Sequence, residues 1–178
     1  MSRFLSLLHL ARQNGWCTTP YCTTCGATDF RAALRQFGAE LADDLADLDL
    51  SALEETSGWE DALRLALDEL KSPDLKDRVL TMWLPQIDRH IRLADLVLFY
   101  YVRRGAVFAP MSIEMLQQWS AKCIDLASQT SDESLVESLI CTLGRHEDYP
   151  ELDAVVTDLV ARGSQRVSLA LRRQVQPN

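Results

Sequence analysis

Apolar residues recur at intervals of three and four along almost the whole chain, and this spacing is the feature that most limits its fold. Phe30, Ala33, Leu34 and Phe37, for example, follow the i, i+3, i+4, i+7 pattern of one helix face. Sustained alternation of polar and apolar residues, which is typical of strands, does not occur, and no Asn-Gly or Asp-Gly dipeptide lies between two such runs. The sequence therefore predicts an all-α protein.

Glycine, proline and capping residues divide this pattern into about nine helices. Pro85 lacks an N–H and should break the chain's helical path at that point. The expected helices span residues 2–13, 39–49, 59–71, 89–104, 112–129, 131–143, 149–162 and 164–175, with shorter ones beginning at Thr28 or Asp29 and at Pro73. Ser51 begins a capping-box pattern that ends at Glu54. We expect them to form one domain over residues 1–178, either a multi-helical bundle or a short α-solenoid.

Helical periodicity also predicts which side chains face the core and which face solvent. The expected core includes the four tryptophans, Trp16, Trp59, Trp83 and Trp119. An apolar stripe is expected for the helix that begins at Pro73, formed by Leu75, Val79, Met82 and Trp83. The most buried helix is expected to contain Leu96, Val97, Phe99 and Tyr100. The outer face of 59–71 is expected to carry Glu60, Arg64 and Asp68.

The segment between the first two expected helices, residues 15–27, carries three of the five cysteines. It contains Cys17 and the sequence Cys22-Thr-Thr-Cys25-Gly26. The turn between two cysteines three residues apart can point both thiolates at one ion, and Gly26 permits the positive φ that turns backbone N–H groups toward the sulfurs. Cys17 offers a third thiolate, so the sequence predicts a metal site and favours zinc.

A structural zinc site commonly takes four ligands, and the fourth has three candidates in this sequence. His9 and His146 rank equally, because His9 is near the loop in sequence and His146 follows a helix-ending glycine. Cys141 ranks next. Cys123 lies on the apolar face of its helix, where a cysteine acts as a small buried hydrophobe.

Two other interpretations of the cysteine loop remain open. The three cysteines can be reduced residues that bind nothing, or they can carry thiol redox chemistry or an iron–sulfur cluster. The spacing C-x4-C-x2-C also occurs around iron–sulfur clusters, but the next cysteine here is nearly a hundred residues further on. An odd number of cysteines is a poor disulfide framework and favours a reducing compartment, so we expect a cytoplasmic protein.

Charge is unevenly distributed along the chain. The net charge is −8 and the pI is near 4.8, which disfavours nucleic acids and anionic membranes as partners. Residues 40–70 hold eleven acidic residues and a single basic one. Four of these acids share one helix face: Glu40, Asp43, Asp44 and Asp47. We expect this face to attract a basic protein partner, as in an immunity or inhibitor protein; the alternative is a face that is merely solvated.

The sequence contains no motif for a known catalytic mechanism. A glycine-rich phosphate loop, a His-Glu-x-x-His pair and a serine nucleophile motif are all missing. The longest nearly apolar run, residues 93–102, is about half the length of a membrane span. We therefore expect a non-enzymatic helical binding protein with a zinc-stabilised loop. The alternative is a metal- or thiol-dependent enzyme or redox sensor that uses Cys17, Cys22 and Cys25.

Overall fold

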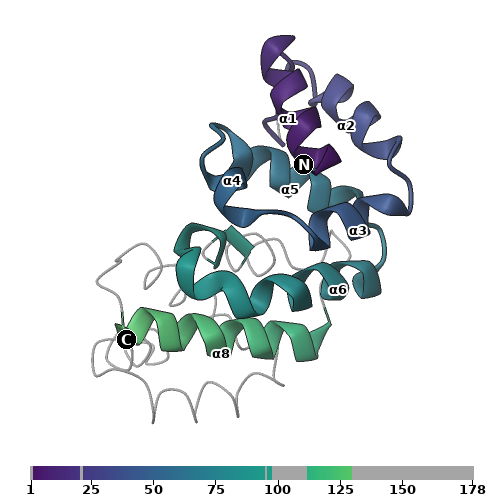
Figure 1. The fold of residues 1–178 in the computed structure, drawn as a ribbon. Helices are drawn as coiled ribbons and strands as arrows, with labels where there is room; N and C mark the ends of the chain where they lie inside the picture. Colours follow the sequence, from purple (N-terminus) through teal and green to yellow (C-terminus); the bar gives the residue numbers. More distant parts are fainter. Residues whose placement is uncertain (1, 21, 95, 98–111, 130–178) are drawn as a thin grey trace, which may run out of the picture. The chain divides into compact units, whose positions relative to one another are not determined.

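A computed structural model describes residues 2–20, 22–94, 96–97 and 112–129, and every regular element in these ranges is helical (Figure 1). No β-strand occurs there, which agrees with the all-α prediction. The helices expected after residue 130 lie outside the described residues, so the count of about nine and the choice between bundle and solenoid stay predictions.

Contacts within the chain divide it into two compact units, Met1–Trp83 and Leu84–Asn178. The single domain over 1–178 stays a prediction. The first unit contains the helices α1 (Arg3–Gln13), α2 (Thr28–Arg35), α3 (Glu40–Ala46), α4 (Leu50–Glu54), α5 (Trp59–Glu69) and α6 (Pro73–Trp83).

Helix α5 is the most enclosed element of the first unit. Its buried residues occupy most of its circumference: Trp59, Ala62, Leu63, Leu65, Ala66, Leu67 and Asp68. A helix that is covered nearly all round belongs in the middle of a fold. Helix α2, which follows the cysteine loop, packs against α5 and so fixes one end of that loop to the core.

The other helices of this unit join through aromatic side chains. The rings of Phe4 in α1 and Phe30 in α2 meet edge-on with centroids 6.5 Å apart. Helix α3 packs against both α1 and α6. The buried indole of Trp83 in α6 donates a hydrogen bond from Nε1 to the carbonyl of Leu45 in α3 at 2.9 Å. A buried tryptophan N–H needs such an acceptor, so this contact fixes the packing of the two helices.

The described part of the second unit begins with the 3₁₀-helix η1 (Leu84–Arg89), which contains Pro85 and confirms the expected break. Residues 91–94 and 96–97 are helical. Leu96 and Val97 are buried as predicted, whereas Phe99 and Tyr100 lie outside the described residues.

Helix α8 (Ile113–Gln129) completes the described part of this unit. The Ser112 hydroxyl accepts from the Met115 N–H at 3.1 Å, which confirms the predicted cap. Trp119 is buried, and its Nε1 donates to the Ala94 carbonyl at 3.3 Å.

Two predicted helix starts were wrong. Asp49, not Ser51, caps α4, and its carboxylate accepts from the N–H groups of Ser51 and Ala52 at 3.0 and 3.2 Å. Helix α2 has no side-chain cap at all, because Ala27 enters the cap position with a φ of 54°. Thr28 is instead the first helical residue, and its hydroxyl donates to the Cys25 carbonyl at 2.5 Å.

Three predictions of burial were also wrong. Met82 is 49% exposed, because the buried stripe of α6 consists of Lys76, Val79, Leu80 and Trp83. Asp68 faces the core rather than solvent, because α5 is covered on most sides. Trp16 is only half-buried, since it begins the cysteine loop.

Candidate metal centre

The cysteine loop, residues 15–27, leaves α1 through a glycine turn. Gly15 has a φ of 66°, and the Trp16 N–H donates to the Ala11 carbonyl at 2.8 Å. A left-handed glycine with this hydrogen bond is the common way to end a helix. The chain then runs past Cys17 and Pro20 to the two remaining cysteines.

The sequence Cys22-Thr-Thr-Cys25-Gly26 folds into a tight knuckle. The Gly26 N–H donates to the Cys22 carbonyl at 2.9 Å, and the Thr28 N–H donates to the Cys25 carbonyl at 3.2 Å. Gly26 has a φ of 60°, so the conformational freedom expected of this glycine is used. Ala27 follows in the same left-handed region, and the knuckle therefore leads directly into α2.

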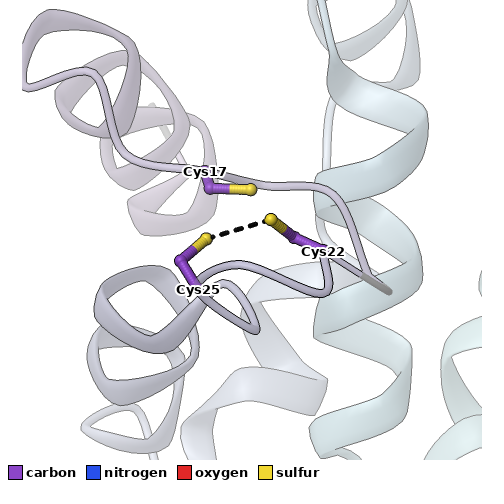
Figure 2. Close-up of side chains that lie close together, drawn as sticks. All are labelled: Cys17, Cys22 and Cys25. Atoms are coloured by element: carbon purple, nitrogen blue, oxygen red, sulfur yellow. Dashed lines mark hydrogen bonds between the residues drawn. The ribbon is translucent and has the colours of Figure 1, made fainter.

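The three sulfur atoms of the loop point toward one another (Figure 2). The Sγ atoms of Cys17, Cys22 and Cys25 all lie within 4.8 Å of each other, and Cys25 Sγ donates to Cys22 Sγ at 3.3 Å. A disulfide requires about 2.05 Å, so these are free thiols. Two thiolates on a tetrahedral zinc ion at 2.3 Å each are about 3.8 Å apart. The group could therefore hold a metal ion with small shifts of its side chains.

The two thiols of the knuckle, Cys22 and Cys25, have different pKa values. Hydrogen bonds from the Cys25 N–H, the Cys25 thiol, the Thr24 N–H and the Cys17 thiol lower the pKa of Cys22 to about 6. The Ala27 N–H favours the Cys25 thiolate, but the hydrogen bond to Cys22 and the nearby Cys17 outweigh it and raise the pKa of Cys25. Cys22 is therefore the thiolate of this pair at neutral pH.

Of the three predicted fourth ligands, His9 alone lies in the described residues. His9 is an exposed residue of α1 and is not among the clustered ligand atoms. His146 and Cys141 lie outside the described residues, so their role stays a prediction. Cys123 is fully buried in α8, as a small hydrophobic residue would be.

Sequence analysis missed an ionic cluster that contacts the cysteine loop. Arg31 of α2 pairs with Glu69 at 3.1 Å and with Asp68 at 3.6 Å, and it also donates to the Pro20 carbonyl at 3.5 Å. Arg35 pairs with the same Glu69 at 3.1 Å. No local motif marks these residues, because the cluster exists only once α2 has packed against α5.

Burial and pairing set the charges of this cluster. Burial by itself would raise the pKa of Glu69, but Arg35, Lys71 and Arg31 together hold it below its usual value. Burial raises the pKa of Asp68, and the positive charges of Arg31, Lys76 and Lys71 offset only part of that effect. Glu69 is also the closer of the two carboxylates to the Arg31 guanidinium, at 3.1 Å against 3.6 Å for Asp68.

Three of the four acids of the predicted docking face have structural roles. Ser2 is the N-cap of α1, and Asp44 reinforces it by accepting hydrogen bonds from the Ser2 hydroxyl and from the N–H groups of Arg3 and Phe4. Glu40 pairs with Arg3, and Asp43 pairs with Arg78 at 2.5 Å. Asp47 is exposed beside them in a shallow hollow.

These different roles predict different costs of substitution. Asp44→Ala should destabilise the protein by about 1 kcal/mol, because the first turn of α1 loses a negatively charged acceptor for two N–H groups. Asp47→Ala should stay within about 0.5 kcal/mol of the wild type. Urea denaturation of the two variants in parallel measures this difference. Equal effects would show that Asp44 does not stabilise the start of α1.

Comparison with protein families, curated proteins and solved structures finds no match to this chain, so its function has to be inferred from its own residues. No described helix combines the length and the hydrophobicity that crossing a membrane requires.

Proposed function

We propose that the protein is a non-enzymatic helical binding protein whose cysteine loop is held by a structural zinc ion. The observation that carries the metal site is the convergence of Cys17, Cys22 and Cys25, whose sulfur atoms lie within 4.8 Å of one another. Zinc is the proposed ion because thiolates are its usual ligands in structural sites and because the cysteines come from one short loop. Bound zinc would link the two halves of that loop on either side of Pro20.

Metal analysis of the protein purified without chelator tests this proposal. We expect one zinc ion per chain and its loss on treatment with a strong chelator at low pH, where the ligands become protonated. Protein that contains no zinc and binds none when Zn²⁺ is added would contradict the proposal. Iron in place of zinc would instead support a cluster-binding protein.

Thiol redox chemistry is the second candidate, and the Cys22–Cys25 pair is the observation that favours it. Their sulfurs are 3.3 Å apart, and the pKa of Cys22 is lowered to about 6. A thiolate beside a second thiol is the arrangement that forms a disulfide on mild oxidation. A metal-free protein in which these two cysteines oxidise reversibly, with Cys17 still reduced, would favour this candidate over zinc.

A basic protein partner remains part of the proposal, and Asp47 is the residue that best supports it. Glu40 and Asp43 pair with arginines and Asp44 bonds to the start of α1, whereas Asp47 makes neither an ion pair nor a side-chain hydrogen bond in the described residues. Charge reversal at Asp47 is therefore the best way to distinguish a partner-binding face from one that is merely solvated. Reversal at Asp43 or Asp44 would also break an ion pair or a contact that caps a helix. Electrostatic steering would appear as slower association at low salt.

A further inference from the structure

Arg31 links the cysteine loop to the buried end of α5. Its guanidinium contacts the carbonyl of Pro20 in the loop and the carboxylates of Asp68 and Glu69 in α5, at 3.5, 3.6 and 3.1 Å. The two carboxylates are only 2% and 4% exposed, so the core fixes their positions. The core therefore fixes the position of Arg31, and Arg31 donates a hydrogen bond to the loop from that position.

The three cysteines depend on this link to different extents. Cys22 and Cys25 belong to a knuckle that closes through its own backbone hydrogen bonds, the Gly26 N–H to the Cys22 carbonyl among them. Cys17 lies on the other side of Pro20, and its approach to the knuckle depends on the path of residues 18–20. Pro20 is buried and is the point of that path which Arg31 contacts.

We propose that Arg31 is a positioning residue for the metal site, which holds the chain at Pro20 so that the Cys17 thiolate completes the group formed by Cys22 and Cys25. This inference rests on the proposed function, because it requires that the three thiolates bind one ion. Arg31 is not a ligand in this scheme. It acts through the Pro20 carbonyl, and its planar fork allows one side chain to contact the loop and two carboxylates together.

The test is alkylation of the zinc-loaded protein, mapped by mass spectrometry, in wild type and in Arg31→Met. With Zn²⁺ bound, wild type should protect all three loop cysteines from iodoacetamide. In Arg31→Met we expect Cys17 to be alkylated while Cys22 and Cys25 stay protected. Zinc affinity should fall by about 10-fold or more, the range for residues that orient ligands. General destabilisation would expose the three cysteines together, so the selective loss at Cys17 identifies positioning.

Arg35→Met is the matched control. Arg35 belongs to the same helix and pairs with the same Glu69 at 3.1 Å, but it is exposed. This variant removes one positive charge and one ion pair without touching the contact at Pro20. We expect it to keep protection at Cys17 and wild-type zinc affinity. A loss of Cys17 protection equal to that in Arg31→Met would overturn the proposal, because charge near Glu69 would then explain both.

Removing Arg31 also leaves Asp68 buried with one less positive charge beside it, and this can unfold the variant. The pair Asp68→Asn and Asp68→Asn/Arg31→Met reduces that problem, because residue 68 is neutral in both variants and any effect on the nearby buried Lys76 is common to the two. We expect Cys17 protection in the first variant and not in the second. If Cys17 stayed protected in the folded double variant, or if both Arg31 variants unfolded, the positioning role of Arg31 would be overturned, but the proposed zinc site would not. Failure of wild type to bind Zn²⁺ would instead overturn the proposed function.

Discussion

Cys22→Ser should weaken zinc binding by more than about 100-fold relative to wild type, which exceeds the loss expected for a residue that only orients a ligand. Cys22 is the thiolate of the knuckle at neutral pH because its pKa is about 6. It can therefore bind zinc without first losing a proton, whereas a serine hydroxyl stays protonated and is a poor zinc ligand. Competition with a chromophoric zinc chelator at pH 7 measures the affinity.

Cys123→Ala is the control for this experiment. It removes a thiol of the same kind from the described residues, but Cys123 is fully buried in α8 and is not one of the clustered ligands. Its zinc stoichiometry and affinity should equal those of wild type. If Cys22→Ser bound zinc as tightly as wild type, the loop would not be the metal site. If Cys123→Ala lost the metal, the ligand set would have to include α8.

The group of three loop cysteines was predictable from the sequence to the extent that it is local. Two cysteines three residues apart, followed by Gly26, define a knuckle whose hydrogen bonds join residues less than five positions apart. Cys17 is close enough in sequence to have been assigned with them. A fourth ligand is a different problem, because it would come from another element, and helical periodicity does not give the distance between two helices.

The helices were predictable for a similar reason. The predicted segments 2–13, 59–71 and 112–129 match α1, α5 and α8 closely, because apolar spacing and local caps are properties of a few adjacent residues. Ser2 caps α1 locally, but the acceptor that Asp44 adds to this helix start comes from about forty residues away. A capping rule that examines only neighbouring residues does not find such an interaction.

Helical periodicity did not predict which charged residues are buried. Lys76 occupies a position of the buried stripe of α6 and is only 2% exposed, while Asp68 is 5% exposed on α5. Sequence rules place charged residues outside, and that is correct unless partners accompany them into the core. Here Arg31 of α2 pairs with both Asp68 and Glu69 of α5. The exception therefore becomes visible only from the packing of three helices.

The contact between α6 and α3 depends on Trp83, whose indole N–H donates to the Leu45 carbonyl. Trp83→Ala should destabilise the protein by about 3–5 kcal/mol, because it leaves a large cavity where the indole is fully buried. Trp83→Phe should cost about 1–2 kcal/mol, since it removes part of the apolar volume and one of the two hydrogen bonds to the Leu45 carbonyl, which keeps the Leu48 N–H as a donor at 3.2 Å. Met82→Ala, one residue away and 49% exposed in wild type, should stay within about 0.5 kcal/mol. Urea denaturation followed by circular dichroism measures all three, and a Trp83→Ala effect as small as that of Met82→Ala would show that Trp83 does not hold α6 against α3.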